Sequence, residues 1–261
     1  MPSLAPPPRI VIHTTRPPVR ALARAAFPHR HARIQIVRTA ADLAGAFRAS
    51  LVDAVLVDLG APSDEGWRAA SLAREFPSAP FFALTPLRTT DAPVVARCAE
   101  LDVADVLIDG IDDAALQALV LPAGFSARFA DALAAPPVVL GLISPLQTRT
   151  WSRVVAHAGL PVRTDGLARS VGVTREHLSR VFALGAGPTL KRVIDLVRLV
   201  AAAELAKNPG FDLENVATVL GFSSLSHLSA TAQRVLGVRA ASLARLRAVD
   251  LFERCARAVR A

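Results

Sequence analysis

The feature that most constrains the fold of this chain is an internal repeat in its second half. One copy spans residues 164–182 and the other spans residues 213–229, about fifty residues later. The matched positions are Ala168 with Ala217, Gly172 with Gly221, and the His-Leu-Ser tripeptides at 177–179 and 227–229. A repeat of core, turn and helix-start positions is much more specific than a single short helical match.

Each copy predicts two short helices joined by a tight glycine turn. In the first copy, Thr164 is the predicted N-cap of one helix, Gly172 ends it, and Thr174 is expected to cap the next helix. The residues expected to be buried are Leu167, Ala168, Val171, Leu178, Val181 and Phe182. Between the copies, residues 189–207 predict one connecting helix. Together these elements make two helix-turn-helix units.

The second helix of the first unit turns polar side chains outward. They are Arg175, Glu176, Ser179 and Arg180. When such a helix lies in the major groove, these side chains reach base edges and phosphates. Arg180 is the strongest candidate for a base contact, because arginine is the commonest partner of guanine. Glu176 has two explanations, since an acidic residue in a first helical turn is also favoured by the helix dipole.

The distribution of charge agrees with a nucleic-acid partner for this half alone. Residues 1–135 hold 13 basic and 14 acidic residues, a net charge of −1, whereas residues 136–261 hold 17 and 8, a net charge of +9. All of the basic excess therefore lies in the half with the repeat. This asymmetry indicates that one domain binds a polyanion and the other does not.

The segment 145–247 resembles the DNA-binding domain of the AraC/XylS family of transcription regulators. The resemblance includes both units, the Gly187-Pro188 step, the long connecting helix, and Gly237-Val238 after the second unit. In that family the connecting helix holds both recognition helices against successive major-groove segments. Carried over by position, Glu176, Ser179 and Arg180 correspond to the base-reading residues of the first unit.

The second unit departs from the family pattern. The matching positions are Leu225, Ser226 and Ala230, and the family usually has arginine where Ala230 stands. This unit is therefore expected to bind mainly through phosphates. The residues expected to do so are Ser223, Ser224, His227, Gln233 and Arg234, and Ser226, at a base-reading position of the family, is a further candidate DNA contact. The final segment, Asp250 to Arg260, predicts a solvated basic helix.

Five short apolar runs alternate with helix-length segments in the first half. The runs start at Ile10, Ile34, Ala54, Phe81 and Asp105. Four segments with helical patterns separate these runs. The first ends at Phe27, and the others cover residues 40–49, 67–76 and 91–101. This alternation predicts an α/β flavodoxin-like domain with a five-stranded parallel sheet, and in such sheets the functional surface lies at the carboxyl ends of the strands.

This half also resembles the receiver domain of bacterial response regulators. Asp58 stands at the position of the phospho-accepting aspartate, and Thr85 at that of the conserved hydroxyl residue. His13-Thr14-Thr15 replaces the acidic pair that holds magnesium, and Asp109-Gly110 replaces the lysine. Phosphoryl transfer to a carboxylate needs such cations. The resemblance therefore implies a degenerate receiver that is not conventionally phosphorylated, in which Asp58 can simply cap the following helix.

Two uses of a degenerate receiver remain open. The segment from Asp91 to Gln117, with Pro93, Val94 and Val95, is where intact receivers usually pair, which implies a homodimer. The alternative is a small-molecule sensing pocket near His13, Asp58, Thr85 and Asp109.

The predicted organisation is a receiver-like domain at 9–121, a linker at 122–144, the DNA-binding domain at 145–247 and a basic helix at 248–261. Pro122 to Pro137 reads as either a broken helix or a hinge. No apolar run reaches the length of a membrane span, and no secretory signal starts the chain, which predicts a cytoplasmic protein with no membrane partner. Cys98 and Cys255 have no paired spacing, so no metal or other cofactor is expected.

The leading hypothesis is a sequence-specific regulator that binds double-stranded DNA, with RNA polymerase as a further partner. The alternative is a protein-interaction adaptor whose second unit has lost base reading, as Ala230 indicates. An enzyme is not expected, because no nucleophile, base and orienting residue form a recognisable set.

Overall fold

The computed structural model describes residues 5–61, 63–86, 88, 92–184 and 187–260. The chain divides into two compact units. The receiver-like unit contains residues 7–128 and 208–210, and the helical unit contains residues 129–207 and 211–261. Within the described ranges, no helix is both long and apolar enough to cross a lipid bilayer.

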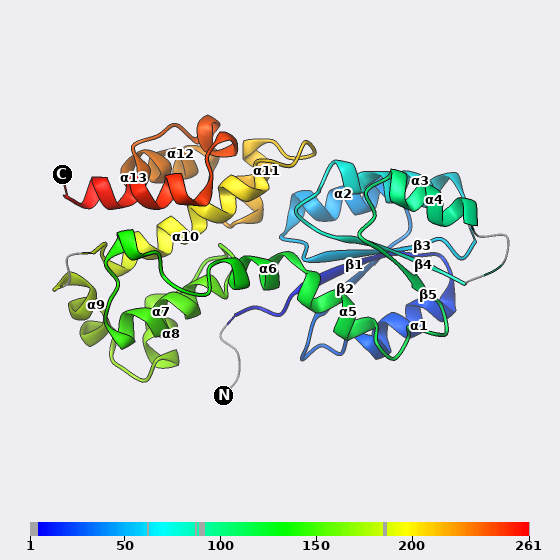
Figure 1. Cartoon of the computed structure of the whole chain (residues 1–261), viewed down its shortest axis with the longest axis horizontal. Coiled ribbons are helices and arrows are strands. Elements are labelled where there is room, and N and C mark those ends of the chain that lie inside the picture. Colours follow the sequence, from blue (N-terminus) through cyan, green and yellow to red (C-terminus); the bar gives the residue numbers. More distant parts are fainter. Residues whose placement is uncertain (1–4, 62, 87, 89–91, 185–186, 261) are drawn as a thin grey trace. The chain divides into compact units, whose positions relative to one another are not determined.

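A parallel five-stranded sheet forms the centre of the receiver-like unit, as predicted (Figure 1). Its strands are β1 (Arg9–His13), β2 (Arg33–Val37), β3 (Ala54–Asp58), β4 (Phe81–Thr85) and β5 (Asp105–Ile108). The strand order β2-β1-β3-β4-β5 is that of a flavodoxin-like sheet. In the register, His13 lies beside Val57, Asp58 beside Leu84, and Thr85 beside Ile108. The last residues of four strands therefore meet at one edge.

Helices cover both faces of this sheet, which explains why its central strands are apolar between their end residues. They are α1 (Pro17–Ala26), α2 (Ala40–Ala49), α3 (Asp64–Ser71), η1 (Leu72–Arg74), α4 (Ala92–Glu100) and α5 (Leu116–Ala123). Val19 of α1 and Val120 of α5 pack on one face. On the other, Phe47 stacks between Phe76 and Phe81, with ring centroids 4.1 and 5.9 Å apart.

Two helix starts differ from the sequence prediction. The third helix begins at Asp64 rather than near Trp67, because the Ser63 hydroxyl accepts a hydrogen bond from Gly66 N at 3.1 Å. The helix expected from Asp91 begins at Ala92, and Asp91 itself lies outside the described residues.

The segment after the receiver-like domain contains two helices with a break between them. Helix α5 continues through Pro122 to Ala123, and α6 (Phe125–Ala132) starts after an extended Gly124. Asp53 holds the break: its carbonyl accepts from Phe125 N at 3.0 Å and its carboxylate from Ser126 N at 2.9 Å. Burial raises the pKa of the Asp53 carboxyl, and the hydrogen bonds that it accepts from Ser126 and from Arg9 N oppose that shift.

The helical unit is built around one long helix. Its elements after α6 are η2 (Val138–Leu140), α7 (Pro145–Val155), α8 (Thr164–Ser170), α9 (Arg175–Ala183), α10 (Leu190–Leu205), α11 (Leu213–Val219), α12 (Leu225–Leu236), η3 (Ala240–Arg245) and α13 (Ala248–Arg260). The predicted connecting helix is α10, which Thr189 caps through Arg192 N. Most of its side chains are buried, so α10 forms the core against which the other helices pack.

The prediction of a fully solvated C-terminal helix is wrong. One face of α13 is buried, through Leu251, Phe252, Cys255 and Ala256. Phe252 makes an edge contact with Trp151 of α7, with ring centroids 6.2 Å apart. The spacing of these apolar residues places them on one stripe of a helix, which the excess of arginines obscured. Arg254 is half-buried and Arg257 exposed on the rest of its surface.

Candidate DNA-binding surface and receiver-like site

The first helix-turn-helix unit, α8 and α9, forms around a left-handed glycine. Gly172 has φ +78°, a conformation that favours glycine. Thr174 caps α9 by accepting from His177 N at 3.2 Å. Leu167, Leu178 and Phe182 are completely buried. The predicted cap of the first helix is wrong by one residue: Thr164 lies inside α8, and Arg163 precedes it without a side-chain cap.

The four candidate base-reading residues of the first unit share one outward face of α9. Arg175, Glu176, Ser179 and Arg180 are all exposed, while the opposite face holds the buried Leu178 and Phe182. Arg175 Nε lies 3.6 Å from Asp165 Oδ1 in an exposed ion pair that water and salt weaken. This face can therefore present two cations to DNA without disturbing the core of the motif.

The second unit, α11 and α12, repeats this construction with one more residue in its turn. Gly221 has φ +65°, and Ser224 caps α12 by accepting from His227 N at 3.1 Å. Ser223 Oγ lies 3.1 Å from His227 Nδ1. Hence both His-Leu-Ser segments follow an N-cap hydroxyl that binds the histidine amide, which gives the repeated tripeptide a local structural role.

The phosphate-binding candidates of the second unit differ in their surroundings. Ser223, Ser224, Ser226, His227 and Gln233 are exposed, as is Ala230 at the family's arginine position. Arg234 instead donates through NH2 to Oδ2 of Asp195 on α10, at 3.0 Å. All six candidates are therefore exposed, and Arg234 in addition bonds a carboxylate within the unit.

The receiver-like site lies at the carboxyl edge of the sheet. His13, Asp58 and Thr85 end β1, β3 and β4, and Asp109 directly follows β5. Asp58 is nearly covered, with 4% of its side chain exposed. It accepts from Thr14 Oγ1 at 2.5 Å and from Gly60 N at 3.1 Å. Asp58 thus shapes the loop between β3 and α3 and does not cap α3, whose N-cap is Ser63.

Arg16 occupies the centre of this site. Its Nε lies 2.9 Å from both carboxylate oxygens of Asp58, its NH2 lies 2.6 Å from Asp58 Oδ1, and NH2 also lies 3.1 Å from Asp109 Oδ2. The hydrogen bonds to Asp58 are the largest cause that raises the pKa of the Arg16 guanidinium. A side chain at position 60 would collide with this guanidinium, so Gly60 leaves the space that Arg16 fills.

His13 and Thr85 line the same edge without joining this cluster. His13 is 4% exposed, and within the described part of the chain neither ring nitrogen has a hydrogen-bond partner. Burial lowers the pKa of His13, and the neighbouring Arg38 backbone, followed by the Glu65 and Asp58 carboxylates, opposes that shift. Thr85 is buried, with its hydroxyl 3.4 Å from the Pro86 carbonyl.

The sequence prediction missed Thr14, Arg16 and Gly60. Arg16 stands three residues beyond the end of β1, one position after the tripeptide compared with the family's acidic pair. A basic residue in a loop at the carboxyl edge, opposite two acidic residues on neighbouring loops, was the available signal. Within the described ranges, no group of three or more His, Cys, Asp or Glu residues could hold a metal ion.

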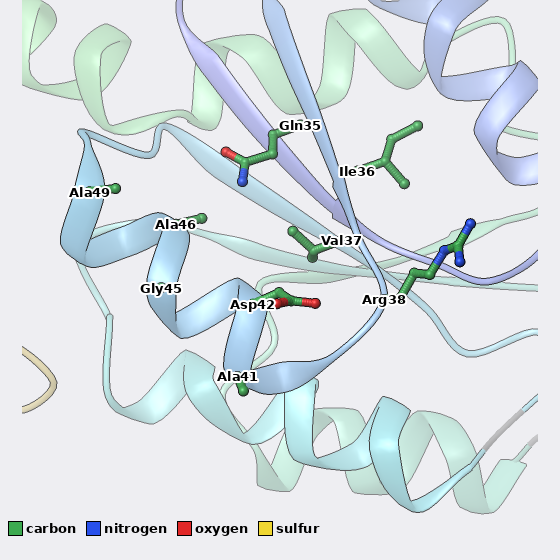
Figure 2. A pocket seen from close by; sticks show the side chains of 9 residues that line it. All are labelled: Gln35, Ile36, Val37, Arg38, Ala41, Asp42, Gly45, Ala46 and Ala49. Carbon is green, nitrogen blue, oxygen red and sulfur yellow. The ribbon is translucent and has the colours of Figure 1, made fainter.

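A separate hollow lies between β2 and α2 (Figure 2). Its lining is mainly small, through Ala41, Gly45, Ala46 and Ala49, and its polar side chains do not converge on one point. It therefore lacks the convergent polar groups that characterise a ligand site.

Comparisons with known proteins place a family domain in the helical unit. Residues 167–245 match a family described as "Helix-turn-helix domain". No curated protein matches the chain.

Similar solved structures include a response regulator from Thermotoga maritima, 14% identical, covering 45% of this chain and 97% of its own, with a TM-score of 0.39. Full-length FixJ from B. japonicum is 16% identical; the match covers 87% of this chain and 96% of FixJ, with a TM-score of 0.38. A Burkholderia pseudomallei response regulator is 18% identical; the match covers 67% of this chain and 97% of that regulator, with a TM-score of 0.37. Residues 167–245 are thus similar to a helix-turn-helix domain, in the segment where the sequence repeat predicts two such units.

Proposed function

We propose that this chain is a sequence-specific transcription regulator that reads bases mainly through α9. The observation that carries the proposal is the outward face formed by Arg175, Glu176, Ser179 and Arg180 on a recognition helix whose other side is fully packed. Arginine and small polar side chains on such a face match the donors and acceptors of the major groove. The net charge of +9 in residues 136–261 supplies the attraction to phosphates.

The second unit contributes phosphate contacts and little base reading. Ser223, Ser224, Ser226 and His227 lie exposed in or just before the first turn of α12, and Gln233 lies further along it. Hydroxyls and free amides at a helix start suit a phosphate oxygen. Ala230 has no group that could hydrogen-bond to a base edge. The resulting DNA site has two unequal halves.

The receiver-like unit acts without conventional phosphorylation. Arg16 and Thr14 already occupy both oxygens of Asp58, the atoms that a phosphodonor would have to reach. Acetyl phosphate with magnesium should leave Asp58 unmodified by mass spectrometry. Stoichiometric modification that Asp58→Asn abolishes would contradict this part of the proposal.

Dimerisation is the proposed use of this unit. Val95 of α4, Ile111 before α5 and Leu119 of α5 are exposed apolar side chains, 39%, 69% and 41% accessible. Burial of such residues between two copies is favourable. A second copy on this surface would present two DNA-binding units. Such a regulator acts on RNA polymerase, either by recruiting or by blocking it.

Selection of bound sequences from random duplex DNA, followed by footprinting, tests the proposal. A reproducible site with one strongly and one weakly base-dependent half supports the regulator. Failure to enrich any sequence would instead support the adaptor, for which Ala230 is the motivating residue. Sedimentation of wild type and Leu119→Glu tests the dimer separately.

A further inference from the structure

We propose that Asp195 of α10 is a positioning residue that orients the second helix-turn-helix unit for DNA, with Arg234 as its structural partner rather than a phosphate contact. This inference rests on the proposed DNA-binding function. It assigns a role to a buried acidic residue on the connecting helix, within a unit that otherwise attracts a polyanion.

The Asp195 carboxylate is placed to hold α12. Its side chain is 7% exposed, and Oδ2 accepts from Arg234 NH2 at 3.0 Å. Lys191 Nζ, one turn earlier on α10, lies 3.7 Å from the same oxygen but is 76% exposed. A largely buried carboxylate that bonds an arginine from another helix makes a stronger and more directional contact than an exposed ion pair.

Two further arginines of α10 attach the ends of the second unit's helices. Arg192 NH2 donates to the carbonyls of Arg234 and Val235, at 3.3 and 3.1 Å, in the last turn of α12. Arg198 NH2 donates to the carbonyls of Leu220 and Gly221, at 3.1 and 3.2 Å, just beyond α11. Carbonyls at helix C-termini lack intrahelical partners and carry partial negative charge, so these cations satisfy them.

The attachment continues to the start of the recognition helix. The Arg198 guanidinium lies 3.9 Å from the centre of the Phe222 ring, and Phe222 meets the His227 ring edge-on, with ring centroids 5.5 Å apart. His227 lies in the first turn of α12. Helix α10 therefore fixes α12 near both of its ends, with Asp195 providing the side-chain contact near the C-terminal one.

Orientation has special importance in this unit because few of its side chains can compensate for a shift. With alanine at position 230, binding depends on where short hydroxyls meet phosphate oxygens. Serine side chains have little reach, so a change in the angle of α12 would separate them from the DNA backbone.

The sign of one substitution distinguishes positioning from direct phosphate contact. If Arg234 bound phosphate, Asp195→Asn would remove a competing negative charge and tighten binding. If Asp195 positions α12, Asp195→Asn weakens binding although it makes the protein more basic. Glu204→Gln is the matched control, because it removes an acidic charge from the same helix at a residue paired only with Lys207 among the described contacts.

The experiment measures affinity of the full chain for its selected site as a function of salt, with footprinting and thermal unfolding of each variant. Asp195→Asn and Arg234→Ala should each weaken binding about tenfold, equivalent to about 1.4 kcal/mol. The double variant should be no weaker than either single variant, because both lose one contact. Protection should be lost over the second half-site alone, and the salt slope should fall by the same amount in Asp195→Asn and Arg234→Ala, because both variants lose the phosphate contacts of the second unit. Glu204→Gln, and Arg257→Ala on α13, should leave the second half-site protected.

DNA binding by Asp195→Asn that is equal to or tighter than that of wild type would overturn the inference. A salt slope lowered by about one unit in Arg234→Ala, with the slope of Asp195→Asn unchanged, would also overturn it. If Asp195→Asn failed to unfold cooperatively, the test would rest on Arg234→Ala. The Arg234 side chain is half-exposed, so its removal disturbs the core less. Wild-type protein that enriches no DNA sequence would refute the proposed function itself. If the wild type bound a selected site and Asp195→Asn bound it equally well, only the positioning role would be refuted.

Discussion

In the receiver-like unit the guanidinium of Arg16 lies between two carboxylates, whereas in the helical unit those of Arg175 and Arg180 are exposed on α9. The same residue type is an internal counter-ion in one unit and an exposed group, which we propose binds DNA, in the other. The distribution of carboxylates explains the difference: residues 1–135 balance their cations, and residues 136–261 hold 17 cations against 8 acidic residues. Arginine count alone therefore does not locate a nucleic-acid surface.

The largest expected effect is the salt dependence of DNA binding. Each phosphate contact releases counterions, so the affinity should fall about 100-fold or more between 50 and 200 mM salt if several contacts form. Fluorescence anisotropy with a labelled duplex would measure the slope. A nearly flat response would show that the exposed cations of the helical unit do not bind phosphates.

Removing the internal counter-ion should have the next largest effect. Arg16→Ala leaves the Asp58 carboxylate buried with only Thr14 and Gly60 as partners, and should lower the free energy of unfolding by about 2 to 3 kcal/mol. Arg16→Lys keeps the positive charge but loses the two-pronged geometry of the guanidinium. Its free energy of unfolding should therefore lie between those of wild type and Arg16→Ala. Arg24→Ala, at an exposed position of α1, the helix that follows Arg16, is the control. If urea denaturation gave the same free energy of unfolding for Arg16→Ala and Arg24→Ala, the counter-ion role of Arg16 would be contradicted.

The buried histidine of the same site should give a smaller, pH-dependent effect. Because burial lowers the pKa of His13 in the folded state, the unfolded chain takes up a proton more readily below the ordinary value of 6.5. The stability contributed by the neutral ring is present above pH 6.5 and is lost as the pH falls towards the folded-state pKa. Denaturation between pH 7.5 and 5.5 should show this loss in wild type. The loss should be reduced in His13→Leu and retained in His29→Leu, a change at an exposed position. An identical slope in all three proteins would argue against a perturbed His13.

Local patterns predicted the elements of both units, and long-range contacts limited the prediction of the site. Alternating apolar runs marked the five strands, and the Thr174 cap marked the first recognition helix, because these signals lie within a few residues. The Arg16 cluster joins residues 42 positions apart, and the Arg234 contact with Asp195 spans 39. Nothing near Arg234 in the sequence distinguishes a phosphate-binding arginine from one that bonds a buried carboxylate. The buried face of α13 was readable from the spacing of Leu251, Phe252 and Cys255, but the charge of the segment outweighed it.

The most direct test of the central claim, that α9 reads the DNA sequence, is the specificity of Arg180→Ala. The affinities of wild type and Arg180→Ala would be compared on the selected site and on duplexes with single base-pair changes, and thermal unfolding would check the fold of the variant. Loss of a base contact predicts weaker binding to the selected site by about 1 to 3 kcal/mol and relaxed preference at one or two base pairs. Arg257→Ala, which removes an equal charge from α13, should keep full preference. A folded Arg180→Ala variant with unchanged preference, combined with preference lost on changing Ser226 or His227, would contradict the claim and move base reading to the second unit.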